Sequence, residues 1–265
     1  MRKFFYRRLR CGCIGFALAL APTLTLAAPA AMPDVPTYAF LSLIGDKLEI
    51  VIAQPQTGSR IDKNRREPPL IIQDPIFDNA AATAAGEAVR KVIPRAELAI
   101  LNSRSPVLFE KQRDLFEEKN GVIAIPDAIR TALQNEKATY LILITKHRDE
   151  AQFQFTNTSE GTGTLEGLGF YLDGATGTRR GDTGESGRGY IAPYVYAKVS
   201  LVDVQTSKVI KKQTIKASMA ISSARARENL ADPWAALTSA EKVSAINRLI
   251  QREIARVIPQ LLKAD

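Results

Sequence analysis

Apolar positions recur along the chain either in short runs and alternations, which predict strands, or at helical spacing, which predicts helices. The two patterns follow each other in an interleaved order. Two apolar runs, Tyr38–Ile44 and Lys47–Ala53, are predicted strands. Gly45-Asp46 stands between them and predicts a tight hairpin turn, because glycine suits the first turn position. The unbroken apolar run Tyr140–Ile144 predicts a strand that is buried on both faces.

Three helices are predicted between these strands from their start signals. Asp74-Pro75 and Ser105-Pro106 each place a capping side chain before a proline, and proline suits the first helical turn. Apolar residues recur at helical spacing after both signals, and a third such pattern runs from Pro126 to about Glu136. We therefore expect three helices in the first half of the chain.

The last third predicts a second hairpin and a long helix. Tyr194–Val204 and Lys208–Ile221 are predicted strands, and the second alternates lysines with apolar residues, as in a half-exposed antiparallel strand. Thr238 and Glu241 form a capping box that begins an amphipathic helix reaching Leu262.

The order of these elements predicts an α/β fold. Helices interleaved with strands indicate a single-domain sandwich over residues 38–265, in which a mixed sheet of two hairpins and central strands is covered by helices. The stretch 157–189 interrupts the pattern and is rich in glycine, so we interpret it as an insertion between neighbouring strands.

Residues 1–30 have the layout of a cleaved secretory signal peptide. Five basic residues precede an apolar run over residues 11–26, and small residues follow, with cleavage expected after Ala27 or Ala30. The run is short for a spanning helix and contains Gly12, Gly15 and Pro22. We therefore expect an exported, periplasmic protein of a Gram-negative bacterium.

Cleavage would change the composition of the chain. Both cysteines, Cys11 and Cys13, lie in the leader, before the place where a lipoprotein carries its lipid-attachment cysteine. Loss of five basic residues leaves 31 basic and 28 acidic residues, which lowers the formal net charge from +8 to +3. The composition therefore argues against a lipoprotein, a thiol site and a nucleic-acid partner.

Candidate catalytic motifs lack the context that their chemistry needs. His147 is the only histidine and has no identifiable triad partner. Asp182-Thr183-Gly184 matches an aspartic-protease tripeptide but lies among polar residues. The glycines from Gly161 to Gly167 miss the dinucleotide-binding spacing by one residue. We expect no catalytic residue, cofactor or metal, although the acids Asp149, Asp173 and Asp182 keep a hydrolase open as an alternative.

Two residue groups are candidate binding surfaces. An apolar segment within the glycine-rich stretch has two interpretations, a core-facing edge or a tip that docks a partner protein; its large residues are Leu168, Phe170, Tyr171 and Leu172. Lys208, Lys212 and Lys216 share one strand face, which suits either plain solvation or contact with an anionic membrane or glycan.

Two stretches resemble one group of exported proteins. Residues 137–145 resemble its central strand, and residues 199–210 resemble its hairpin, in which an apolar strand ends in Asp-Val before a Thr-Gly turn. The group comprises the amino-terminal domain of TolB, the curli-secretion lipoprotein and the penicillin-binding-protein activator lipoproteins. The resemblance implies an α/β sandwich that acts through protein contacts in the envelope. Here Ser207 replaces the turn glycine, and the lipid-attachment cysteine is missing.

Together these observations favour a non-catalytic periplasmic protein that binds or helps to assemble other envelope components. A carboxylate-dependent hydrolase and an anionic lipid- or glycan-binding protein are the alternatives. The partner and the oligomeric state do not follow from the residues.

Overall fold

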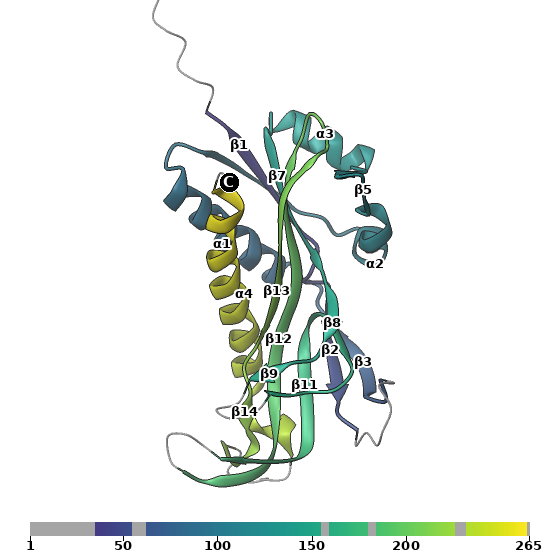
Figure 1. Cartoon of the computed structure of the whole chain (residues 1–265), viewed down its shortest axis with the longest axis vertical. Coiled ribbons are helices and arrows are strands. Elements are labelled where there is room, and N and C mark those ends of the chain that lie inside the picture. The colour runs from purple at the N-terminus through teal and green to yellow at the C-terminus, as the bar shows by residue number, and fades with distance from the viewer. Residues whose placement is uncertain (1–34, 55–61, 155–158, 180–183, 226–231, 264–265) are drawn as a thin grey trace, which may run out of the picture. The chain divides into compact units, whose positions relative to one another are not determined.

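The computed structural model describes residues 35–54, 62–154, 159–179, 184–225 and 232–263 (Figure 1). The predicted leader over residues 1–30 lies outside these ranges. The described residues from Val35 onward form one unit of mixed α/β structure, with a large mixed sheet and four α-helices, which confirms the predicted fold class.

Ten strands of the described chain form the main sheet. They are β1 (Thr37–Ser42), β2 (Lys47–Ile52), β3 (Arg65–Ile71), β4 (Glu97–Leu101), β7 (Tyr140–Lys146), β8 (Arg148–Glu150), β11 (Thr164–Arg179), β12 (Ser186–Asp203), β13 (Val209–Ser218) and β14 (Ile221–Ser222). Two small pairs lie apart: β5 (Glu118–Lys119) with β6 (Val122–Ile123), and β9 (Phe153–Gln154) with β10 (Ser159–Glu160). The order of the main path is β3-β2-β11-β12-β7-β1-β4.

The helices follow the predicted start signals. They are α1 (Ile76–Val92), α2 (Pro106–Leu115), α3 (Asp127–Asn135) and α4 (Ser239–Leu262), with short 3-10 turns η1 (Ser223–Arg225) and η2 (Pro233–Ala236). The capping box of α4 is present in full, because the Thr238 hydroxyl accepts from the Glu241 amide and the Glu241 carboxylate accepts from the Thr238 amide. No helix in the described part of the chain is long and apolar enough to cross a membrane.

The long strand β12 organises the sheet, because two strands lie end to end along one of its edges. Residues 186–196 of β12 pair with β11, and residues 197–203 pair with β7, both antiparallel. In the same way β1 pairs with β7 and β2 pairs with β11, both in parallel. Consecutive strands β1 and β2 therefore run in the same direction and occupy successive parts of the sheet.

This arrangement shows that Gly45-Asp46 does not form the predicted hairpin. Strands β1 and β2 do not pair with each other. β2 lies between β11 and β3, whereas β1 lies between β7 and β4. The chain shifts sideways at residues 43–46 without reversing its direction. The pairing of β12 with β13 is the antiparallel hairpin that was predicted, and Ser207 takes a left-handed conformation in its turn (φ 57°).

The glycine-rich stretch also differs from the predicted insertion, because β11 and the start of β12 occupy most of it. Gly169 shows why glycine is compatible with a central strand here. A Cβ at Gly169 would collide with the backbone carbonyl oxygen of Glu49 on β2 and would lie 2.6 Å from the hydroxyl oxygen of Tyr194, the residue that faces it on β12. The glycine therefore makes room for the backbone of β2 and for a buried tyrosine ring instead of marking a loop.

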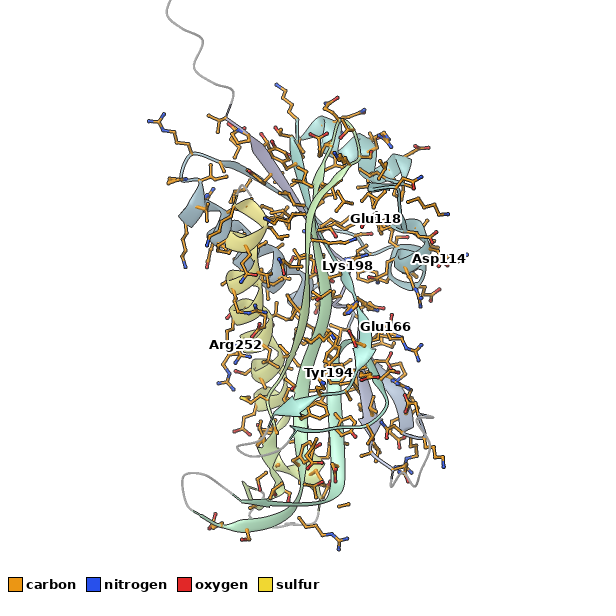
Figure 2. The ribbon with its side chains drawn as sticks, in the orientation of Figure 1. Asp114, Glu118, Glu166, Tyr194, Lys198 and Arg252 are labelled. Carbon is orange, nitrogen blue, oxygen red and sulfur yellow. The ribbon has the colours of Figure 1, made fainter. Side chains whose placement is uncertain are left out.

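Helices cover both faces of the sheet. On one face α1 and α4 pack together and against the sheet, in the largest apolar cluster, which includes Phe40, Phe170 and Ile250. On the other face α2 and α3 cover the ends of β1 and β7. Further along that face a cluster of tyrosines and phenylalanine packs beneath the segment that contains β8 and β9. Tyr194 and Lys198 lie on β12 on this second face (Figure 2).

Candidate functional site

The candidate site lies where three parallel strands end. Strands β1, β4 and β7 run in parallel, so their carboxyl ends meet at one level of the sheet. The chain leaving β1 continues through β2 and β3 before it enters α1 on one face, and the chain leaving β4 leads directly to α2 on the opposite face. The first turn of α1 lies beside the end of β1, because Asp78 bonds to Ser42, Ile44 and Gly45. Open α/β sheets bind ligands in the crevice at such a switch point.

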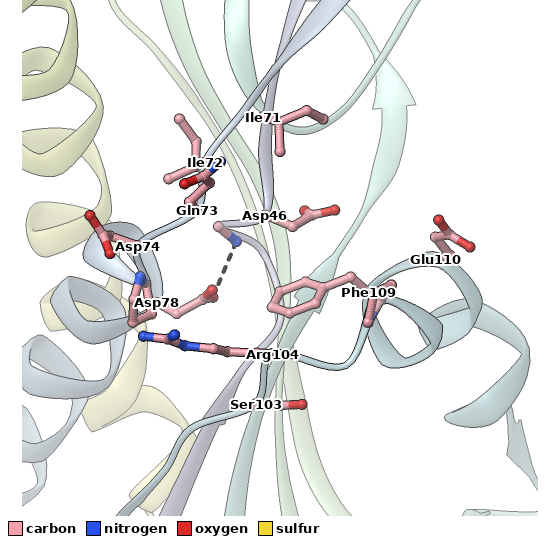
Figure 3. A pocket seen from close by; sticks show the side chains of 13 residues that line it. Asp46, Ile71, Ile72, Gln73, Asp74, Asp78, Ser103, Arg104, Phe109 and Glu110 are labelled. Atoms are coloured by element: carbon pink, nitrogen blue, oxygen red, sulfur yellow. Dashed lines mark hydrogen bonds between the residues drawn. The ribbon is translucent and has the colours of Figure 1, made fainter.

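A cavity of about 390 Å³ occupies this crevice (Figure 3). Its walls come from the turn after β1, the end of β3, the first turns of α1 and α2, and the segment after β4; the polar lining residues are Asp46, Gln73, Asp74, Asp78, Ser103, Arg104 and Glu110. Ile71, Ile72 and Phe109 supply large apolar side chains to the same walls. The volume lies in the range of small-ligand sites.

Asp78 is the most buried charged residue of the cavity wall, with 6% of its surface exposed. Its Oδ1 accepts hydrogen bonds from the Ser42 hydroxyl (2.6 Å) and from the amides of Ile44 (2.9 Å) and Gly45 (3.1 Å). Burial raises the pKa of Asp78 to about 6. The carboxylate therefore holds the turn after β1 against the first turn of α1 and titrates near neutral pH.

Gln112 of α2 fastens the opposite wall in a similar way. Its side-chain amide is buried and donates to the carbonyl oxygens of Leu43 (2.9 Å) and Phe109 (2.7 Å). Its Oε1 accepts from the amide of Lys146 (2.7 Å) at the end of β7. One side chain thus links α2 to the ends of β1 and β7.

A second cavity, of about 570 Å³, adjoins the first, and both are lined by Asp46, Ile71, Phe109 and Glu110. Its lining is rich in charged side chains, several of which are paired. Lys146 Nζ lies 2.5 Å from Asp46 Oδ1, and Lys47 Nζ lies 2.8 Å from Glu49 Oε1.

One exposed apolar side chain lines the first cavity, and two others follow residues of its wall in the sequence. Ile71, which lines it, is 69% exposed. Ile76 and Val107, each next to a proline of the cavity wall, are 41% and 54% exposed in the first turns of α1 and α2. Exposed apolar groups that gather beside a cavity are typical of a surface that contacts another molecule.

The predicted partner-binding segment is buried, and its Leu168 lines the second cavity from the core side. Leu168, Phe170 and Tyr171 are at most 1% exposed, and Leu172 is 9% exposed. The Phe170 ring packs edge-on against Trp234, with 5.5 Å between the ring centroids. In the structure these four side chains pack in the core, so they form no exposed docking tip.

The predicted lysine face is exposed, and two of its three members have acidic partners. Lys212 Nζ lies 2.7 Å from Glu118 Oε2, and Lys216 Nζ lies 2.5 Å from Asp149 Oδ2. Lys208 is exposed just before β13. Contact of this face with an anionic membrane or glycan remains a prediction.

The other candidate acids have local structural partners. Asp149 Oδ2 also lies 3.1 Å from His147 Nε2, and the bond from Lys216 lowers the pKa of Asp149 to about 2. Asp173 accepts from the amides of Ala175 and Thr176 where the pairing of β11 with β12 shifts register. Asp182 lies outside the described residues. Within the described ranges, no group of three or more histidine, cysteine or acidic side chains could hold a metal ion.

Sequence reasoning missed Asp78, Gln112 and Ile71 as parts of one site. Asp78 follows a predicted helix start, but nothing in the pattern indicates that it bonds to Ser42, 36 residues earlier. The one available signal was the rule that the carboxyl ends of parallel strands meet at a crevice. To apply this rule one must know the order of the strands in the sheet, and that order is set by long-range strand pairing.

No protein-family model and no curated protein matches the chain. Among solved structures, XCC0632 from Xanthomonas campestris, of the DUF330 family, is 9% identical over 88% of each chain, with a TM-score of 0.38. A homologue of a neuraminyllactose-binding hemagglutinin from Helicobacter pylori is 8% identical over 87% of each chain, with a TM-score of 0.38. A PelC dodecamer from Paraburkholderia phytofirmans is 10% identical over 87% of this chain and 89% of its own (TM-score 0.32).

The resemblance to the TolB, curli-secretion and penicillin-binding-protein activator group stays a prediction.

Proposed function

We propose that this protein is a non-catalytic component of the bacterial cell envelope that binds a segment of a partner protein in the crevice at the carboxyl ends of β1 and β4. The leader predicted over residues 1–30 supports the location. The single observation that carries the binding role is the exposed Ile71 side chain in the wall of the first cavity.

A polypeptide suits this crevice for a second reason. Neither α1 nor α2 has a side-chain hydrogen bond at its N-cap, and both helices begin in the cavity wall. Part of the first turns is already satisfied by backbone carbonyls, since the amide of Ile76 donates to Asp74 and the amide of Leu108 donates to Ser105, and Pro106 has no amide hydrogen. A bound segment can offer an apolar side chain to Ile71 and Phe109 and polar groups to the acids of the same wall.

Site-specific photo-crosslinking in the native cell tests the proposal. The photoreactive residue replaces Ile71 in the full chain, and Ile210 on β13, which is 50% exposed, is the matched control position. We expect an adduct with an exported protein from position 71 that is absent from position 210 and is lost when Phe109→Ala alters the cavity wall. Equal labelling from both positions, or no adduct from position 71, would contradict the binding role.

The hydrolase alternative has one observation in its favour, the raised pKa of Asp78 in a cavity wall. The three donors on its Oδ1 give this carboxylate a structural role that needs no reaction. A hydrolase screen of the wild type and Asp78→Asn separates the two. Activity that is lost in a variant with an intact fold would favour the enzyme.

A further inference from the structure

We infer that the outer edge of β4 is an interface at which a second copy of this chain adds its own β4 in antiparallel pairing, with the two-fold axis at Ala99. This interface is independent of the proposed function, because it concerns backbone groups at the edge of the sheet. The inference depends on the composition of the sheet edges, on the backbone groups that β4 turns outward, and on a register in which the strand matches itself.

The edges of the main sheet differ in how they are protected. In the described part of the chain β3, β4 and β13 each pair with a single strand of this sheet. Strand β3 contains Pro68 and Pro69, which have no amide hydrogen, and β13 contains Lys211, Lys212 and Lys216. Prolines and lysines on an edge strand oppose pairing with a further strand. The sequence of β4, Glu-Leu-Ala-Ile-Leu, contains neither, so this edge is open to pairing.

The backbone groups of Leu98 and Ile100 point away from the sheet. The amide of Glu97 donates to the carbonyl oxygen of Pro36, just before β1, at 3.2 Å. Successive residues of a strand turn their amide and carbonyl groups to opposite edges, so those of Leu98 and Ile100 face outward. Within the described ranges no hydrogen bond connects them to a segment beyond the sheet. Unpaired amides and carbonyls in a row are the template on which another strand pairs.

Ile100 adds an apolar contact at the same edge. Its side chain is 48% exposed, although it lies within a strand of the main sheet. Leu98 shares its face of β4, because side chains two residues apart point to the same side, and packs partly buried against the cluster that includes α1. A strand added at this edge would cover Ile100 and gain the free energy of burying its apolar surface.

The register of self-pairing favours a second copy as the occupant. In antiparallel pairing the residues with outward backbone groups form the hydrogen-bonded pairs. With the two-fold axis at Ala99, Leu98 of each copy pairs with Ile100 of the other, and the small Ala99 side chain faces itself. Glu97, the charged residue of β4, lies opposite Leu101, so like charges do not meet. One surface thus serves both copies, as a two-fold interface requires.

A disulfide at the two-fold axis tests the register. Directly opposed residues of a non-hydrogen-bonded antiparallel pair have Cα atoms about 4.5 Å apart, a separation that a disulfide can span. The full chain is made with Cys11→Ser and Cys13→Ser, so that Ala99→Cys adds the only thiol. Mild oxidation of this purified protein should give a covalent dimer, which electrophoresis without reductant resolves.

Glu97→Cys, in the same background, is the matched control on the same face of β4. Residue 97 of one copy faces residue 101 of the other, so the two positions 97 lie about 13 Å apart, too far for a disulfide. Glu97 is exposed, whereas Ala99 is only 8% exposed, so random collisions would favour cross-linking at position 97. Dimer from position 99 alone supports the register, and the reverse order overturns it.

Sedimentation velocity over a concentration series measures the dimer without a cross-link. Ile100→Lys places a charge opposite Leu98 of the second copy and should raise the dimer Kd about tenfold or more. The control Ile210→Lys changes a similarly exposed isoleucine on β13 and should leave the Kd unchanged. Both side chains are exposed, so both variants should keep the wild-type circular dichroism spectrum.

Two results would overturn the inference. One is a wild type that stays monomeric throughout the series, and the other is a dimer that Ile100→Lys leaves intact. A photoreactive residue at position 100 that labels another exported protein, and not this chain, would assign the edge to a strand of that protein instead.

Discussion

The Cα of Gly45 packs directly against the carboxylate of Asp78. The Gly45 amide donates to Asp78 Oδ1 at 3.1 Å, and a Cβ at residue 45 would lie 2.7 Å from Oδ2 and 3.0 Å from the Asp78 amide nitrogen. This contact joins the turn after β1 to the first turn of α1 and forms part of the cavity wall. The glycine is therefore needed for close approach.

The first prediction follows from this contact. Gly45→Ala should lower the free energy of unfolding by about 1–3 kcal/mol, because the added methyl group overpacks a site that includes backbone atoms. Urea denaturation measures the change. Gly174→Ala is the control, since a Cβ there meets no atom within 4 Å. Equal stability of the two variants would show that the turn relaxes without cost.

The second prediction concerns pH. The pKa of Asp78 is raised from 3.8 to about 6 in the folded protein, so the folded state holds this proton more tightly than the unfolded state. The protonated carboxyl of Asp78 therefore adds most to the free energy of unfolding below about pH 4, and this added stability is lost as the pH rises to about 6. A pKa shift of this size changes the free energy of unfolding by about 3 kcal/mol.

Comparison with Asp78→Asn isolates that contribution from other carboxylates. Unfolding free energies of the wild type and the variant are measured between pH 4 and pH 7. The wild type should lose stability relative to the variant across this interval. A constant difference between the two proteins would mean that Asp78 titrates at its ordinary pKa.

The third prediction concerns Gln112. Gln112→Ala removes the donor to the buried Leu43 carbonyl and the acceptor of the Lys146 amide. We expect a loss of about 1–3 kcal/mol of unfolding free energy for each buried group left without a partner. Thermal and urea denaturation measure it, with the exposed helical substitution Gln134→Ala as the control. A change no larger than that control would indicate that water replaces the amide.

The fourth prediction separates the two partners of Asp149. The bond from Lys216 is the main cause of its low pKa, and the His147 contact contributes less. In Lys216→Met the pKa of Asp149 should rise from about 2 toward 3.8, whereas His147→Gln should raise it by a smaller amount. Titration of the carboxyl carbon by NMR distinguishes them. The reverse order would assign the main effect to His147.

Several elements could be predicted because their signals are local. The capping box of α4 needs only Thr238 and Glu241, three residues apart, and both bonds are present. The unbroken run at Tyr140–Ile144 predicted a buried central strand, and β7 lies between β1 and β12. Periodicity and caps act over a few residues, so these parts of the fold follow from the order of residues alone.

The candidate site required the tertiary structure. Gly45-Asp46 has the residues of a hairpin turn, but β1 and β2 run in the same direction in different parts of the sheet. The glycine is explained instead by Asp78, which occupies the space beside it. Gly169 is similar, because the Glu49 carbonyl on β2 and the Tyr194 ring on β12 leave no room for a Cβ there, although the local sequence suggests a loop. Residues distant in the chain form the crevice, and only strand pairing and packing bring them together, since local patterns carry no information about strand order.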